Sequence, residues 1–477
     1  MVLSNFSNLN ILCIGDIILD SYIHGNVNRI SPEAPIPVFK YESERFVLGG
    51  AGNVARNVVS GGGSCNLISV VGNDEEFKIL SRLVQKTKNL KASLILENRK
   101  TTLKQRYISG QQQILRVDNE TDKAISNSCE SKVFNIFKKY IKKSDIVILS
   151  DYDKGILTDS LIKKLILFSK KCKKTTIVDP KKKSFDVYAG ADVLTPNLNE
   201  LLKAGNINLK KSSLEEKTIK KLSEEFIKKY NFSSVITTRS SNGMTIVSKA
   251  EKTYNLSSKA LEVYDVSGAG DTVIAYLSLS LASGMSLVDS AKIANRAAGI
   301  SVGKLGTTCV FNEEVFENEL FEKKIVSQKE AKLFLDKLKP SKKIGFTNGC
   351  FDLIHSGHIN YLKKSKKYCD ILILGLNSDK SVESLKGKNR PILDLDERLK
   401  VLSNFEFIDL IIVFNELTPL KLIKDLKPNF LFKGKDYKKK EVVGSKEIQN
   451  WNGKTILINY EKEKSTSNII KRIKNET

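Results

Sequence analysis

A carboxylate stands directly after a run of small residues in the stretch from Asp265 to Thr272. Four small residues precede it: Ser267, Gly268, Ala269 and Gly270. Small residues let backbone N–H groups close around an anion at the start of a helix, where the helix dipole also favours negative charge. Asp271 could then accept a proton from a hydroxyl while that oxygen attacks the terminal phosphate of a nucleotide. An ordinary glycine-rich turn before a core helix is the alternative, although the whole octet is far more specific than Gly-x-Gly alone.

Two of the three histidines in the chain, His355 and His358, lie three residues apart. That spacing places both rings on one face at the start of a helix. Between them, Gly357 has no side chain, so a phosphate could approach the backbone there. Zinc is the metal alternative, but the usual helical pair is His-x-x-x-His with a third ligand nearby, and the sequence has no Cys-x-x-Cys. The spacing therefore favours a phosphate over a metal, and ordinary core or surface histidines are the other alternative.

Regular secondary structure must position a site such as the one at Asp271. Over the first 310 residues, short apolar runs alternate with amphipathic helical stretches. Five runs are typical of strands: Ile11–Gly15, Asp145–Ser150, Thr175–Asp179, Val193–Thr195 and Val235–Thr238. The alternation predicts an α/β domain with a mostly parallel sheet covered by helices.

A second series of apolar runs begins at Lys343. It consists of Ile344–Thr347, Ile371–Gly375, Leu410–Phe414, Phe430–Phe432 and Thr455–Ile458. Between the two series glycine disappears, charge rises, and residues 326–338 form the pattern of an amphipathic helix. We predict a first domain at 1–318, a helical linker at 319–342 and a smaller α/β domain at 343–477.

The composition excludes several classes of protein. The 477 residues are 41% hydrophobic and 28% charged, which is too apolar for a disordered chain. The net charge of +24 suggests anionic partners, but only 12 basic residues are Arg and no nucleic-acid-reading module is recognisable. No apolar run approaches the roughly 18 residues of a membrane span, and seven scattered cysteines fit a reducing compartment. We expect a soluble, cytoplasmic protein whose partners include neither nucleic acid nor membrane.

The octet at 265–272 resembles the C-terminal signature of the ribokinase-like sugar kinases. Other segments match as well: Gly15-Asp16, Gly49 to Asn57, and Asn197-Leu198-Asn199-Glu200. The resemblance implies a small β lid, and a nucleotide held by the small-residue loop, since no Walker A motif is present. It implies that residues 197–200 bind the nucleotide phosphates, with Asn197 and Glu200 holding Mg²⁺ through water, and that a monovalent cation binds nearby. The sugar would be held by Asp16, Asp20, Gly49, Gly50 and Asn53.

Two polar segments resemble those of heptose 7-phosphate kinases, a subgroup of the same superfamily. The first is the proline-rich segment 29–38, with Arg29 and Glu33. The second is a strand pair with cationic and amide side chains: Lys104, Arg106, Gln112 and Arg116. Such side chains suit a phosphorylated polyol, and we expect Lys104, Arg106 and Arg116 to hold its remote phosphate. A solvated edge hairpin is the alternative that the pattern alone favours.

The His-x-Gly-His segment resembles the signature of the cytidylyltransferase-like nucleotidyltransferases, which have a Rossmann-like fold. In that family the histidines contact the triphosphate while pyrophosphate leaves. The resemblance implies that further residues of this domain bind the nucleotide and its phosphates: Thr347, Asn348, Gly349, Phe351, Lys363, Arg390, Arg398, Gly434, Lys435, Asp436, Ser465, Thr466 and Ser467. Two departures put loop conformations in question: residues 461–464 lack the usual glycine, and Leu417 replaces a common acidic residue.

The order of the two halves resembles the bifunctional heptose 7-phosphate kinases and heptose 1-phosphate adenylyltransferases of Gram-negative bacteria. That resemblance implies phosphorylation of D-glycero-β-D-manno-heptose 7-phosphate at O1, followed by adenylyl transfer to heptose 1-phosphate, both with ATP and Mg²⁺. The product would be ADP-heptose for lipopolysaccharide. A separate phosphatase must act between the steps, and a homodimer through the kinase domain is implied. Another sugar, or CTP in the second site, is the alternative.

Overall fold

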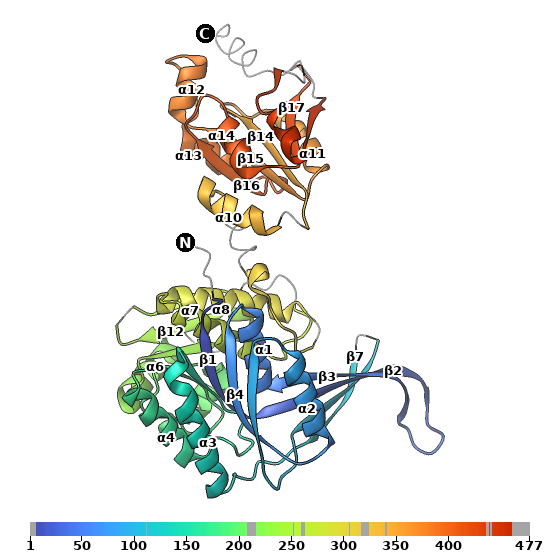
Figure 1. The fold of residues 1–477 in the computed structure, drawn as a ribbon, viewed down its shortest axis with the longest axis vertical. Helices are drawn as coiled ribbons and strands as arrows, with labels where there is room; N and C mark the ends of the chain where they lie inside the picture. Colours follow the sequence, from blue (N-terminus) through green and yellow to red (C-terminus); the bar gives the residue numbers. More distant parts are fainter. Residues whose placement is uncertain are drawn as a thin grey trace. The chain divides into compact units, whose positions relative to one another are not determined.

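The computed structural model describes residues 6–110, 112–207, 216–250, 252–258, 263–304, 306–315, 324–338, 341–435, 438 and 441–459. The chain divides into two compact units between residues 315 and 316. Both units are layered α/β structures (Figure 1).

A nine-stranded sheet forms the centre of the described part of the first unit, in the order β13-β12-β11-β10-β9-β8-β1-β4-β5. The strands are β1 (Asn10–Gly15), β4 (Ser64–Val71), β5 (Leu90–Leu96), β8 (Ile146–Ser150), β9 (Thr175–Asp179), β10 (Val193–Leu194), β11 (Ser234–Thr238), β12 (Met244–Ser248) and β13 (Tyr254–Leu256). Neighbours pair in parallel, except that β12 is antiparallel to β11 and β13. Strands such as β8 are apolar and buried along their length because both faces of the sheet are covered. The predicted mostly parallel sheet is confirmed.

Helices cover both faces of this sheet. They are α1 (Ala51–Ser60), α2 (Glu75–Lys86), α3 (Asn127–Tyr140), α4 (Asp159–Lys171), α5 (Leu198–Ala204), α6 (Glu216–Tyr230), α7 (Ala269–Ala282) and α8 (Leu287–Val302). Val133 of α3, Leu165 of α4 and Phe226 of α6 share one core with Leu149 of β8. Helix α7 packs against α1, α8, β8 and β9. The packing of α7 on the central strands brings Asp271, in its first turn, to the sheet.

A four-stranded lid, in the order β3-β2-β6-β7, extends from the first unit. Its strands are β2 (Ile17–Ile30), β3 (Pro37–Gly50), β6 (Leu103–Ser109) and β7 (Gln112–Asn119). The long hairpin of β2 and β3 projects away from the helices (Figure 1). The predicted polar strand pair is the β6–β7 hairpin, in which Arg106 lies opposite Arg116 and Lys104 opposite Asp118. Because opposite residues point to the same face, Lys104, Arg106 and Arg116 share one face of the lid.

The second unit contains a parallel sheet in the order β16-β15-β14-β17-β18. The strands are β14 (Ile344–Gly349), β15 (Ile371–Asn377), β16 (Leu410–Phe414), β17 (Phe430–Gly434) and β18 (Lys454–Ile458). The helices are α10 (Gln328–Leu338), α11 (Ser356–Lys366), α12 (Asp379–Lys386), α13 (Leu395–Ser403) and α14 (Leu420–Leu426). The central strand β14 lies where the strand order reverses, and ligands bind beyond the carboxyl end of such a strand. The Rossmann-like arrangement predicted from the sequence is confirmed.

Helix α10 falls in the range predicted as a linker, but it packs in the second unit. Phe334 and Leu335 are buried in one core with Phe346 of β14 and Ile412 of β16. The amphipathic pattern of this segment therefore supplies an apolar face to the sheet instead of a free-standing connection. The domain boundaries at 318 and 342 stay predictions.

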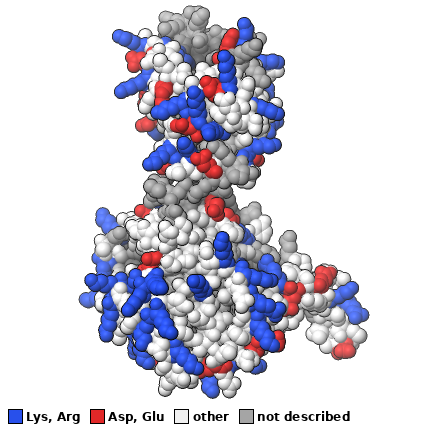
Figure 2. Space-filling view, in the orientation of Figure 1, with Lys and Arg blue, Asp and Glu red and all other residues white. Residues whose placement is uncertain are grey.

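The surface carries charge on both units. On the face shown in Figure 2, Lys and Arg are distributed with Asp and Glu among them. None of the described helices is both long and apolar enough to span a membrane.

Candidate active sites

Asp271 lies in the first turn of α7 and is 2% exposed. Asn53 Nδ2 donates to Oδ2 of Asp271 at 2.8 Å, and the Tyr152 hydroxyl donates to Oδ1 at 2.6 Å. Burial raises the pKa of Asp271 to about 6, although both hydrogen bonds favour the charged form. At neutral pH the carboxylate is therefore mostly charged, and it is a stronger base than an ordinary aspartate.

The small-residue loop before Asp271 has a conformation that requires glycine at one position. Gly268 is the N-cap of α7 with a φ of 79°, and a Cβ there would lie 2.6 Å from Asn53 Nδ2. A Cβ on Gly270 would meet open space, and Gly270 lines a pocket. First-turn N–H groups have no partner within their helix, so those of Gly270 and Asp271 can be offered to an anion in that pocket.

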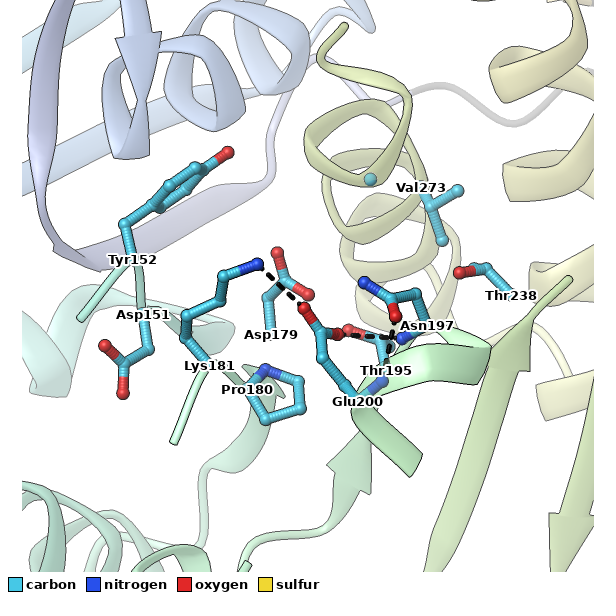
Figure 3. Close-up of a pocket in the computed structure, with 11 residues that line it drawn as sticks. Asp151, Tyr152, Asp179, Pro180, Lys181, Thr195, Asn197, Glu200, Thr238 and Val273 are labelled. Atoms are coloured by element: carbon cyan, nitrogen blue, oxygen red, sulfur yellow. Dashed lines mark hydrogen bonds and ion pairs between the residues drawn. The ribbon is translucent and has the colours of Figure 1, made fainter. Parts of the chain in front are cut away.

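The pocket, with a volume of about 130 Å³, lies beside the start of α7 (Figure 3). Its lining residues mostly end or follow parallel strands: Asp151, Tyr152, Asp179, Pro180, Lys181, Thr195, Asn197, Glu200, Thr238, Gly270 and Val273. Asn197 is the N-cap of α5, where its Oδ1 accepts the Glu200 N–H at 3.0 Å while Glu200 Oε2 accepts the Asn197 N–H at 2.9 Å. Leu198 and Asn199 lie between these two residues in the first turn. The Asn-x-x-Glu motif thus forms a capping box that presents both residues to the pocket.

Charged side chains meet at one end of this pocket. Lys181 Nζ lies 3.0 Å from Glu200 Oε1. Burial, and then the charge of Glu200, hold the pKa of Asp179 well above its usual range, with Lys181 acting in the opposite direction. A divalent cation would relieve this repulsion, so the oxygen donors fit Mg²⁺. Within the described residues no three His, Cys, Asp or Glu side chains are grouped to hold a metal, so water and nucleotide phosphates would have to complete its shell.

Four titratable residues that line this pocket do not belong to the motifs found in the sequence: Asp151, Tyr152, Asp179 and Lys181. Asp151 and Tyr152 directly follow β8, and Asp179 ends β9. Polar residues at the carboxyl ends of neighbouring parallel strands converge on one edge of the sheet. That position was the signal that could have identified them.

The predicted sugar-binding aspartates have different surroundings. Asp20 is buried, pairs with Arg106 NH1 at 2.6 Å, and accepts the Thr307 hydroxyl at 3.3 Å. Asp16 accepts three backbone N–H groups of the loop 152–156 at 3.0–3.3 Å, so it anchors that loop.

Two predicted glycines allow the lid and α1 to approach these carboxylates. A Cβ on Gly49 would lie 2.2 Å from Asp20 Oδ2. Gly50 has a φ of 55° and is the N-cap of α1, the helix that carries Asn53. Asn53 thereby contacts Asp271, and Asp20, which pairs with Arg106, lies close enough to act on the Asp271 carboxylate.

The predicted phosphate-binding side chains of the lid differ in exposure. Arg106 is buried, whereas Arg116 is partly exposed and pairs with Asp118 at 2.7 Å. Lys104 Nζ lies 3.8 Å from Glu120 Oε2, and burial lowers the pKa of Lys104. The remaining predicted lid residues are exposed: Arg29, Glu33 and Gln112.

The two histidines of the second unit lie at the start of α11. His355 is the N-cap, and His358 is in the first turn. Their ring centroids are 3.8 Å apart, and the Phe351 centroid is 5.2 Å from that of His358. Phe351 has a φ of 45°, which a residue with a side chain rarely adopts. The structure thus brings these three predicted residues together after β14.

His358 is an uncharged ring at neutral pH. Burial lowers its pKa to about 4, and the neighbouring His355 and Lys386 act in the same direction. Its Nδ1 accepts the backbone N–H of His355 at 3.4 Å. The ring proton is therefore assigned to Nε2, which can donate a hydrogen bond.

The ends of β14 and β17 hold further predicted residues. The Thr347 hydroxyl lies 2.7 Å from the hydroxyl of Tyr361, and the Asn348 carbonyl accepts Lys433 Nζ at 3.1 Å. Gly349 and Gly434 are the last residues of these two adjacent strands. Lys435 directly follows β17 and donates its backbone N–H to the carbonyl of Ile458 at 3.1 Å. The predicted Lys363 is not brought to these strand ends, because its Nζ lies 5.7 Å from the centre of the Phe407 ring, which precedes β16.

The two predicted arginines of this site are tied to protein groups. Arg390 contacts the buried carboxylate of Asp352. Arg398 is fully buried, donates to the carbonyls of Cys350 and Asn377 at 2.6 and 2.8 Å, and pairs with Asp379 at 2.6 Å. Through NH1 and NH2, Arg398 therefore fixes the turn after β14, while its buried Nε has no hydrogen-bond partner among the described residues. Its role in nucleotide binding stays a prediction.

Several predicted residues of the second unit lie outside the described residues. They are Asp436, Ser465, Thr466 and Ser467, and the segment 461–464 lies there as well. Leu417 is exposed. The roles of these positions stay predictions.

Comparison with known proteins gives one family for each unit and a shared family for the whole chain. Residues 8–313 match the pfkB family of carbohydrate kinases, and residues 346–472 match the cytidylyltransferase-like family. The bifunctional protein HldE of Campylobacter jejuni subsp. doylei is 45% identical over 470 residues, covering 98% of this chain and 97% of that protein. That of Aliarcobacter butzleri is 42% identical over 475 residues, covering 97% of each.

Solved structures share the fold of the first unit. Phosphofructokinase-2 from Escherichia coli, in complex with substrates and products, aligns with a TM-score of 0.56 at 18% identity, covering 65% of this chain and 97% of that one. Arabidopsis thaliana ribokinase, complexed with ribose and ATP, aligns with a TM-score of 0.51 at 16% identity, covering 65% and 98%.

Proposed function

The chain belongs to the HldE family of bifunctional proteins and is a heptose kinase and adenylyltransferase of ADP-heptose biosynthesis, and we propose that Asp271 and the pair His355 and His358 are its two reacting centres. The observation that carries the kinase assignment is a buried carboxylate, held at both oxygens, at the N-terminus of α7 beside a pocket.

In the first site, the Asp271 carboxylate accepts the proton of the O1 hydroxyl of heptose 7-phosphate. O1 attacks the γ-phosphorus of ATP, the bond from that phosphorus to the β,γ-bridging oxygen breaks, and ADP leaves with the bond electrons. N–H groups at the start of α7 stabilise charge on the transferring group. Asn197 and Glu200 would hold Mg²⁺ through water, where the cation neutralises phosphate charge. The product is the 1,7-bisphosphate.

In the second site, an oxygen of heptose 1-phosphate attacks the α-phosphorus of ATP. The bond to pyrophosphate breaks, and ADP-heptose forms. The attacking phosphate oxygen is already ionised, so the site needs no base. A neutral imidazole that donates a hydrogen bond to the crowded phosphorus centre suits this reaction, and the lowered pKa of His358 supports that role for this ring.

The reaction sequence also requires partners. The 7-phosphate must leave between the two steps, and we assign its removal to a separate phosphatase in the cytoplasm.

A homodimer through the lid is supported by four apolar side chains that are more than half exposed there: Ile30, Ile36, Tyr41 and Leu115. Sedimentation should show a dimer for the parent protein and a monomer for Leu115→Asp.

Mass spectrometry of the products tests the proposed sequence of reactions. With ATP and heptose 7-phosphate alone, we expect the bisphosphate and ADP to accumulate. ADP-heptose and pyrophosphate should form only after a phosphatase that removes the 7-phosphate is added, and replacing ATP by CTP in that second step should give no nucleotide sugar. Failure to form the bisphosphate, or ADP-heptose without the phosphatase, would contradict the proposal.

A further inference from the structure

Tyr152 is placed to control the orientation of the Asp271 carboxylate. Its hydroxyl donates to Oδ1 at 2.6 Å, while Asn53 Nδ2 donates to Oδ2 at 2.8 Å. Each oxygen of this buried side chain thus has one donor, and the two donors come from different elements, the loop after β8 and helix α1. Two directional bonds on opposite oxygens fix the plane of a carboxylate, which a single bond would leave free to turn.

The loop that carries Tyr152 is itself held in place. Asp16 accepts the backbone N–H of Tyr152 at 3.0 Å and two further N–H groups of the same loop at 3.3 Å. On the other side, Asp151 accepts the Asp153 N–H at 2.8 Å and the Tyr188 hydroxyl at 2.6 Å. Tyr152 also lines the pocket beside the start of α7 (Figure 3). A rigid loop therefore delivers one hydroxyl to the carboxylate at the edge of the pocket.

We propose that Tyr152 is a positioning residue for phosphoryl transfer, whose hydroxyl holds Asp271 in the orientation that accepts the proton of the sugar hydroxyl. This inference rests on the proposed role of Asp271 as the base. It adds to that role a group outside the sequence motifs, one that touches the base and not the transferring phosphoryl group.

The electrostatics around Asp271 make this role measurable. Among the described residues, the other charged or titratable neighbours that act on Asp271 or respond to it are Asp20, Lys104, Asp179 and Cys13. The Tyr152 hydrogen bond favours the ionised carboxylate and so lowers the pKa of Asp271. The pKa of Tyr152 is itself raised far above its usual value by burial and by Asp271, so its hydroxyl stays protonated and acts only as a donor.

Tyr152→Phe removes the hydroxyl and keeps the ring. For this variant we expect kcat/KM of phosphoryl transfer to fall about 10- to 100-fold, the scale of a lost hydrogen bond to a charged group. The acid limb of the pH profile of kcat/KM should move up by about one pH unit, because the carboxylate loses a donor to its ionised form. Because parent and variant are assayed with the same substrates, a difference between their acid limbs arises from a group on the enzyme and not from ionisation of a substrate. Adenylyl transfer by the same preparation reports whether the protein is intact, and it should not change.

The matched control is Tyr276→Phe, which removes the hydroxyl of another buried tyrosine, one that lies on α7 but donates to the Val310 carbonyl at 2.8 Å and not to Asp271. It should leave the acid limb where it is. An acid limb in Tyr152→Phe that superimposes on the parent, or one that moves equally in Tyr276→Phe, would overturn the inference. Asp271→Asn separates the two proposals: if it loses phosphoryl transfer while Tyr152→Phe behaves as the parent, only the Tyr152 inference fails. If Asp271→Asn keeps full activity, both fail.

Discussion

Helices α7 and α11 each begin beside a group that we assign to catalysis, Asp271 and His358. The two groups differ in how burial changes their affinity for a proton. Burial raises the pKa of Asp271 to about 6 and lowers that of His358 to about 4. The directions are opposite because burial disfavours the charged form in both cases, and the carboxylate is charged without its proton whereas imidazole is charged with it. One physical effect thus prepares the first site to accept a proton and the second to donate hydrogen bonds without becoming charged.

Removing the carboxylate should separate the two sites most strongly. Asp271→Asn keeps the shape of the side chain but cannot accept the proton of the sugar hydroxyl. Phosphoryl transfer should fall by about 10²–10⁴-fold, the scale of a lost general base. Coupled assay of ADP formation measures this loss, and adenylyl transfer in the same sample should match the parent. A comparable loss of both activities in a folded variant would show that the sites are not independent.

The reverse variant is His358→Ala. It removes one hydrogen-bond donor from the triphosphate, so adenylyl transfer should fall by about 10²–10³-fold. Pyrophosphate release measures this step, and phosphoryl transfer serves as the control that should not change. Retention of full adenylyl transfer would exclude the ring from the reacting site.

Titration sharpens the comparison without mutation. Asp271 must be ionised to act, so kcat/KM of phosphoryl transfer should decline as the pH falls through about 6, approaching about tenfold per pH unit below it. His358 should show no NMR titration between pH 5 and 8, since its pKa is about 4. The chain has three histidines, and the histidine signal that is missing from the spectrum of His358→Ala is that of His358. A His358 titration near pH 6.5 would mean that the ring is not buried as described.

The smallest expected effect concerns substrate affinity at the lid. Arg116 is partly exposed and shares a face with Lys104 and Arg106. Arg116→Ala should raise the KM for heptose 7-phosphate by about 3- to 10-fold, because solvent weakens each exposed ionic contact. Heptose without the phosphate is the matched control substrate, and its KM should be unchanged. Equal effects on both sugars would place the phosphate elsewhere.

The sequence predicted the architecture well because long-range order here follows from local patterns. Short apolar runs such as Ile146–Leu149, bounded by polar residues, favour strands buried on both faces, and their alternation with helices implies parallel sheets. The exception was α10, whose amphipathic pattern is the same for a linker helix and for one that packs on a sheet. Which surface covers an apolar face is a tertiary property that the pattern does not contain.

The sites were predicted as far as their residues form contiguous motifs. Asp271 and Asn53 belong to such motifs, and so do the two histidines of α11. Tyr152 and Asp179 are single residues after strands, and only the assembled sheet edge brings them to the pocket. The burial of Arg398 is equally invisible in the sequence, since its partners come from two separate segments: Cys350 follows β14, and Asn377 and Asp379 lie where β15 leads into α12.

The central claim is that two independent sites act on ATP at different phosphorus atoms, and a mixing experiment tests it most directly. Asp271→Asn and His358→Ala, each confirmed to be folded, are combined with ATP, heptose 7-phosphate and the added phosphatase. Each variant alone should form little ADP-heptose. The mixture should form it at a rate near that of the parent protein, because each variant supplies the step that the other has lost. A mixture as inactive as its two components would contradict the account.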